Sequence, residues 1–179
     1  MKPFNFLKNF CKSLLIIIAI VFISNNSFAG NNKGALRIRA FIEFDQQPIE
    51  YAQIDIYVDS KKIDSFSTNL KGEFKLFLDL DKNYIINISK PGFVSKKIEI
   101  STSIPKNESG IWQYDFFVDL FKHVPGLDLT PLNKPITIIK YDSRSGMFEH
   151  DVEYTLAMKA EVNSVLQQQI ALRKLASKN

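Results

Sequence analysis

Few residues of this 179-residue chain have the types and spacing that metal binding or catalysis requires. Its two histidines, His123 and His150, belong to no metal-ligand motif. Its single cysteine is Cys11, and Ser145 lacks the strand–turn–helix context that exposes a nucleophilic serine. We therefore expect no catalytic residue, no metal site and no cofactor, and we predict that the protein is not an enzyme.

One segment has the opening of a calcium-binding loop. Asp79, Asp81 and Asn83 occupy the first, third and fifth positions of such a loop. The sixth position is Tyr84 instead of glycine, and the twelfth is Lys90 instead of glutamate. This segment is therefore interpreted as a polar hairpin turn.

Aromatic side chains offer another kind of chemistry, because flat rings can stack on a ligand such as a sugar. Most of the aromatic residues fall at inward positions of the strands described below. Four fall on the mixed faces that also carry polar side chains: Phe41, Tyr57, Phe117 and Phe121. These four are a possible ligand platform. The alternative is that a C-terminal helix covers them.

That helix is predicted from a change of hydrophobic period at Asp151, which is a plausible N-cap. Apolar residues then recur at helical spacing over about 25 residues, or roughly 38 Å, which is longer than the predicted strands. The second half of the helix can therefore present a stripe to a partner or a second copy: Val165, Leu166, Ile170 and Leu172. Gln169 within the stripe favours a solvent-facing or partner-facing seam over a dry core. The alternative is a helix packed along its whole length.

Alternation of apolar and polar residues dominates from residue 35 to about residue 121 and predicts about seven short strands separated by turns. This pattern is typical of an all-β sandwich. Pro135 to Tyr141 can add one strand at an edge. We therefore expect a mainly β, seven- to eight-stranded transthyretin/Ig-like sandwich followed by the helix. The predicted core includes Ile54, Ile56, Phe74, Leu76, Ile86 and Phe116.

The segment from Ala35 to Ile100 resembles the carboxypeptidase regulatory-like domain, a transthyretin-like sandwich. The matching motifs are Pro48, Ala52-Gln53-Ile54-Asp55-Ile56, Thr68-Asn69-Leu70-Lys71-Gly72-Glu73-Phe74, Tyr84-Ile85-Ile86 and Gly92-Phe93. Asn69 stands where the family usually has aspartate, and Asn83 where it often has glycine. The resemblance implies a structural or binding domain of an exported bacterial protein.

The first 29 residues have the three parts of a secretory signal peptide. Lys2, Lys8 and Lys12 precede an apolar run, which ends at the small-residue exit Ser27-Phe28-Ala29. The run is about half as long as a membrane span, so we expect cleavage before Gly30 and no transmembrane span afterwards. The alternative is that the segment is retained as a membrane anchor. Without these three lysines the chain is nearly neutral. It also has no clustered basic stripe, and both observations argue against nucleic-acid binding.

Four segments are therefore expected: a signal peptide (1–29), a carboxypeptidase regulatory-like sandwich (30–121), a connector with a possible extra strand (122–150) and an amphipathic helix (151–179). The expected location is periplasmic, outer-membrane-associated or secreted. The expected function is a non-catalytic structural or protein-interaction module of the bacterial cell envelope. Its partner would be an envelope protein, or a second copy bound through the helix. The alternative is a glycan-binding module that uses exposed aromatic rings.

Overall fold

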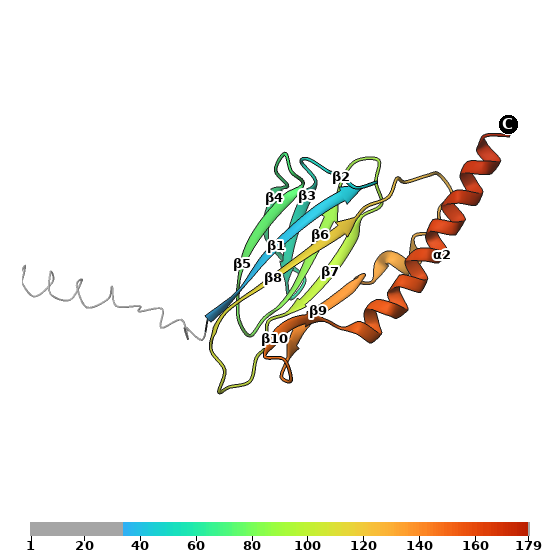
Figure 1. Ribbon diagram of the computed structural model, residues 1–179. Coiled ribbons are helices and arrows are strands. Elements are labelled where there is room, and N and C mark those ends of the chain that lie inside the picture. The colour runs from blue at the N-terminus through green and yellow to red at the C-terminus, as the bar shows by residue number, and fades with distance from the viewer. Residues whose placement is uncertain (1–33, 179) are drawn as a thin grey trace, which may run out of the picture. The chain divides into compact units, whose positions relative to one another are not determined.

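The computed structural model describes residues 34–178 of the chain, and the predicted signal peptide lies outside this range. Ten strands form two sheets in the described part, and one long helix follows them (Figure 1). The predicted fold class, a β-sandwich with a C-terminal helix, is confirmed. The strands outnumber the expected seven or eight because two short ones, at residues 47–48 and 147–150, have weak sequence signals.

The small sheet is built around β1 (Gly34–Phe44). On one side β1 pairs in parallel with β8 (Gly110–Asp119), and on the other it pairs antiparallel with β5 (Glu73–Asp79). The two-residue β2 (Gln47–Pro48) pairs with the end of β1. In the described chain, β8 and β5 are therefore the outer strands of this sheet.

The large sheet has the strand order β10-β9-β7-β6-β3-β4. Its strands are β3 (Gln53–Val58), β4 (Lys61–Ser67), β6 (Asn83–Ser89), β7 (Lys96–Ser101), β9 (Thr137–Asp142) and β10 (Met147–His150). The extra strand predicted near Pro135 exists as β9, but its expected position at an edge is wrong. β9 pairs in parallel with β7 on one side, and β10 pairs with its other side.

The core lies between the two sheets and contains the inward residues of the alternating strands. Ile54, Ile56, Phe74 and Ile86 are each at most 4% exposed. Leu76 and Phe116 are partly buried against the same cluster. The predicted core is therefore confirmed. Its register follows from the period of two, because a shift of one residue would place charged side chains between the sheets.

Thr68 and the turn after it fix the approach of β4 to β5. The Thr68 hydroxyl is buried; it donates to the Ile49 carbonyl and accepts from the Ala52 N–H, both at 2.8 Å. The Asn69 side chain accepts from the N–H groups of Lys71 and Glu73. The segment that carries the family resemblance is thus a hydrogen-bonded turn with a structural role.

The C-terminal helix α2 (Val152–Ala176) begins where the sequence predicts, with the Asp151 carboxylate accepting from the Tyr154 N–H at 3.0 Å. Its inner side packs on a second apolar cluster, formed with the segment after β8 and the short 3₁₀ helix η2 (Thr130–Asn133). Leu127 and Leu132 supply the main contacts from that segment. No helix among residues 34–178 combines the length and apolar character needed to cross a membrane.

Lys96 is buried at the start of β7, at an inward position of its strand. Its ammonium donates to the Asp119 main-chain carbonyl and lies 5.5 Å from the centre of the Phe121 ring. Burial lowers the pKa of Lys96 to about 8. The folded protein therefore holds this proton less tightly than the unfolded chain does.

We expect the free energy of unfolding to increase as the pH rises from about 8 toward 10.5, the ordinary lysine value. In this window the unfolded chain still binds the proton and the folded protein does not. The expected gain is about 1–3 kcal/mol, and Lys96→Met should abolish it. Urea titrations across the window measure it, with the exposed Lys61→Met as the control. A wild-type protein whose stability stays flat there would contradict the assignment.

Candidate interaction site

The outer face of the small sheet carries exposed aromatic and apolar side chains. Phe77 on β5, Ile111 on β8 and Phe117 on β8 are 61%, 59% and 66% exposed. Phe41 on β1 is the register partner of Phe117, and their rings stack with centres 5.0 Å apart and planes 20° apart. We call these four residues the aromatic face. Single exposed apolar residues are ordinary on a protein surface, so these four, which lie on one face of the small sheet, are treated together as a candidate site.

Two arginines from β1 lie among the rings of the aromatic face. The Arg37 guanidinium lies 5.7 Å from the centre of the Phe77 ring, and the Arg39 guanidinium lies 5.7 Å from that of Phe41. Arg39 also donates through Nε to Asp115 at 2.9 Å. This hydrogen bond holds the pKa of Asp115 below its ordinary value. The ion pair and the ring contacts hold Arg39 between the outer strands.

A shallow hollow of about 450 Å³ lies on the same face. Arg37 and Arg39 of β1, Lys75 and Phe77 of β5, and Gln113 of β8 contribute to its lining. Cationic, amide and aromatic groups thus converge on one open surface. Aromatic residues and arginine are the types enriched where proteins bind other proteins.

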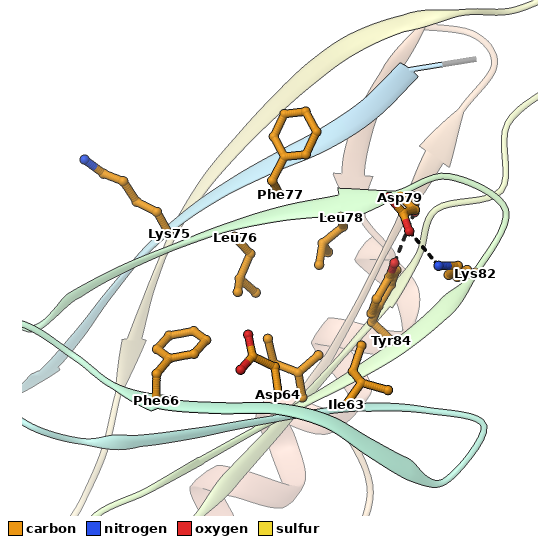
Figure 2. Close-up of a pocket in the computed structure, with 11 residues that line it drawn as sticks. Ile63, Asp64, Phe66, Lys75, Leu76, Phe77, Leu78, Asp79, Lys82 and Tyr84 are labelled. Atoms are coloured by element: carbon orange, nitrogen blue, oxygen red, sulfur yellow. Dashed lines mark hydrogen bonds and ion pairs between the residues drawn. The ribbon is translucent and has the colours of Figure 1, made fainter. Parts of the chain in front are cut away.

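A second groove, of about 400 Å³, lies at the open side of the sandwich between β4 and β5 (Figure 2). Figure 2 shows Leu76 and Leu78 pointing toward β4, whereas Phe77 and Lys75 point the opposite way. Ile63 on β4 borders the groove and is 53% exposed. Lys82 and Asp79 form an ion pair of 2.6 Å at one end. Phe77 and Lys75 line both this groove and the hollow on the aromatic face.

The structure separates the four residues of the predicted ligand platform. Phe41 and Phe117 stack on the outer face of the small sheet. Tyr57 lies on the large sheet and borders a different hollow. Phe121 is only 7% exposed and belongs to the second apolar cluster beneath α2. The prediction of one four-residue platform is therefore wrong, because a mixed strand face does not reveal which sheet carries it or what covers it.

The predicted partner-binding stripe on α2 is largely covered. Val165 is 3% exposed, and Leu166 and Leu172 pack against the same apolar cluster. Ile170 is 43% exposed and faces away from it. The predicted seam at Gln169 is also wrong, because this side chain is buried and donates to the Lys122 carbonyl. The connector after β8 folds back under the helix and occupies the place of the expected partner.

The histidines lie apart from each other on the surface. His150 ends β10, where its Nδ1 is 3.3 Å from the Tyr114 hydroxyl. His123 follows β8, and its N–H donates to the Gly92 carbonyl. Within the part of the chain that the structure describes, histidine and acidic side chains form no group of three that could hold a metal ion.

Phe77, Ile111 and the two arginines are site residues that sequence reasoning did not select. Phe77 and the arginines occupy outward positions of their strands, so the alternation pattern carried that signal. The alternation pattern does not show which strands pair, and it is the pairing of β5, β1 and β8 that places these side chains on one face. Phe77 and Phe117, for example, lie on the two strands that flank β1.

Comparison with known proteins gives similarities among solved structures. No protein-family model and no curated protein matches this sequence. Among solved structures, the TIE protein of Bacillus anthracis is similar over 49% of this chain and 17% of its own, with 17% identity and a TM-score of 0.39. The C-terminal fragment of the pilus adhesin SpaC from Lactobacillus rhamnosus GG is similar over 52% of this chain and 48% of its own, with 13% identity and a TM-score of 0.38.

Enzymes also occur among the similar structures. The 3-chlorocatechol 1,2-dioxygenase of Rhodococcus opacus 1CP is similar over 50% of this chain and 60% of its own, with 11% identity and a TM-score of 0.37. This chain thus spans less than two thirds of the length of each of these three structures. The dioxygenase corrects our expectation that the protein is not an enzyme, because proteins with catalytic activity share this weak fold similarity. We therefore withdraw that exclusion.

Proposed function

We propose that this protein is a protein-interaction module of the bacterial cell envelope, and that it binds its partner through the aromatic face. The observation that carries the proposal is the exposure of Phe77, Ile111 and Phe117 on one face of a folded sandwich. Covering a phenylalanine side chain contributes about 1.5–3 kcal/mol. Rings stacked on a rigid sheet also lose little conformational entropy on binding.

The binding surface then lies on the small sheet, whereas the sequence predicted it on the C-terminal helix. The inner side of α2 already packs on its own cluster, whereas the aromatic face has no covering element in the described chain. Arg37 and Arg39 add hydrogen-bond donors among the rings. The face therefore combines apolar anchors with polar groups that can orient a partner, as protein interfaces do.

A photo-cross-linking amino acid placed at position 117 tests the proposal in the cells that make the protein. We expect an adduct with a second polypeptide at position 117, and at least about tenfold less adduct at position 156 on the helix. Leu156 is the matched control because it is 62% exposed and outside the aromatic face. Equal labelling at the two positions, or labelling at position 156 alone, would refute the proposal.

A glycan is the second candidate ligand, favoured by the stacked rings of Phe41 and Phe117 beside Gln113 and Asp115. Affinity electrophoresis through gels that contain soluble polysaccharides tests it. Retardation that Phe117→Ala removes and Leu156→Ala leaves intact would favour a glycan. Unchanged mobility in every gel, together with a protein adduct at position 117, would favour a protein partner.

Export of the mature chain is part of the proposal and is supported by the leader sequence. An intact mass that begins at Gly30 is the expected result for protein recovered from the envelope or medium. Membership of the carboxypeptidase regulatory-like family is also proposed. It is supported by the Thr68-to-Gly72 turn, whose hydrogen bonds explain the spacing of that motif.

A further inference from the structure

We propose that the free edge of β8 binds an extended peptide strand of another protein. The peptide would have apolar side chains at alternate positions and a basic residue opposite Asp119. This inference rests on the proposed interaction function and specifies how the partner binds. A strand added beside β8 would also border the aromatic face through Phe117.

The backbone of β8 has unused hydrogen-bonding groups along this edge. The N–H of Leu120, directly after β8, donates to the Glu43 carbonyl of β1 at 2.8 Å. Alternate residues of a strand point their backbone groups the same way, so the even-numbered residues of β8 face β1. The N–H and C=O groups of residues 111, 113, 115 and 117 therefore point away from the sheet, as does the N–H of Asp119, whose carbonyl accepts from Lys96. In the described chain no second strand pairs with them.

β8 has few of the features that protect edge strands from pairing, because its charged residues are Asp115, which is paired with Arg39, and Asp119. Protected edges carry charged side chains, lysine above all, or proline or a bulge. β4 has two lysines and a bulge at Ile63, where its register with β3 shifts, and β5 has Lys75. β8 has ten residues in one unbroken register with β1, and none of them is lysine or proline. The edge strand β10 also lacks lysine and proline but has only four residues, so β8 is the edge best suited to accept another strand.

A hollow beside β8 can receive the inward side chains of such a peptide. It measures about 250 Å³ and is lined by Tyr114 and Phe116 of β8 and by Ile139 of β9, among others. The hollow exists because the large sheet has six strands and the small sheet only four, of which β2 has two residues. A strand paired with β8 would cover this hollow with its alternate apolar side chains.

The carboxylates near the end of β8 favour a peptide with a positively charged side chain at that position. Asp119 is the register partner of Glu43 on β1, and neither carboxylate forms an ion pair with any described residue. The hydrogen bond from Lys96 goes to the main-chain carbonyl of Asp119. Burial has the larger effect on the pKa of Lys96, and the Asp119 carboxylate acts on Lys96 only as a nearby charge that raises this pKa. Burial, aided by the neighbouring Asp119 carboxyl, raises the pKa of Glu43. A lysine or arginine on the added strand would compensate this pair.

The probe is an acetylated peptide in which valine alternates with threonine and a lysine stands near the N-terminus. This places the lysine beside Asp119 in an antiparallel pairing. Fluorescence anisotropy with the mature protein should give a Kd on the order of 10 µM. Gln113→Pro should weaken binding at least about tenfold, because it removes an outward N–H that β1 does not use. Replacing the peptide lysine with glutamate should also weaken binding.

Lys75→Pro is the matched control, because by the same alternation it removes an outward N–H from the edge of β5 and should leave binding unchanged. A peptide with N-methyl groups on the amides that face β8 tests the same pairing without altering the protein, and it should not bind. Binding that survives both Gln113→Pro and N-methylation, or no binding at roughly millimolar protein, would overturn the inference.

Sedimentation distinguishes a second copy from a peptide. A dimer of the wild-type protein that Gln113→Pro dissociates would overturn the peptide assignment in favour of pairing between two β8 strands. If the probe fails but the adduct at position 117 persists, the aromatic face retains its proposed function and only the strand-addition mode is lost. If both fail, the proposed function is lost as well.

Discussion

Replacing Phe74 with alanine is expected to lower the free energy of unfolding by about 3–5 kcal/mol. The side chain is 4% exposed and belongs to the cluster between the two sheets. Its ring lies 6.1 Å from that of Phe66 on β4, and its register partner on β1 is Ala40. A truncated side chain would leave a cavity that these strands cannot close, because their backbone pairing fixes their positions.

Phe77→Ala is the matched control, because it changes the same residue type on the same strand. Phe77 is 61% exposed, and we expect its truncation to cost less than about 1 kcal/mol. Glu73→Ala is a second control, at a charged outward position whose ion pair with Lys75 measures 3.2 Å. Denaturant titrations compare the three variants. Similar losses in the free energy of unfolding for Phe74→Ala and Phe77→Ala would mean that the inner and outer faces of β5 are wrongly assigned.

Thr68→Val is expected to lower the free energy of unfolding by about 2–4 kcal/mol, although the two side chains have nearly the same shape. The hydroxyl is the partner of two buried main-chain groups, the Ala52 N–H and the Ile49 carbonyl. Valine would leave both without that partner and cut off from water. The loss would therefore come from unsatisfied hydrogen-bonding groups, with little change in packing.

Thr68→Ser keeps the hydroxyl and loses a methyl group, so it should cost about 1 kcal/mol. Denaturant titrations measure both variants, and hydrogen exchange at the Ala52 amide identifies the cause. This amide should exchange faster in Thr68→Val than in Thr68→Ser. Equal stability of the two variants would show that the methyl group matters more than the hydroxyl.

The alternation of side chains predicted most of the strands, because a half-buried strand reveals its own inner face. It did not select Lys96 as a core residue, although the structure buries this lysine at an inward position of β7. The partner of each strand could not be predicted in this way. The pairing of β1 with β8 depends on contacts between residues far apart in sequence.

The sequence predicted only part of the candidate site, because the alternation pattern shows the face of a strand but not its neighbours. Phe41 and Phe117 were selected because they are aromatic residues on mixed strand faces, and the structure brings them together. Tyr57 met the same criterion and lies on the other sheet. Phe121 met it as well, but the connector and α2 bury it. The path of a connector with three prolines has no periodic signal, so the surface it covers could not be predicted.

The parallel pairing of β1 and β8 has a consequence for how quickly the chain can fold. The ion pair between Arg39 and Asp115 joins residues 76 positions apart, and the whole β1–β8 ladder has the same separation. Until residues 110–119 are available, β1 lacks a neighbour on one side. Chains dominated by such distant contacts fold in about milliseconds to seconds. We therefore expect closure of this long loop to be a late, slow event that leaves one side of β1 unpaired while the rest of the chain is being synthesised.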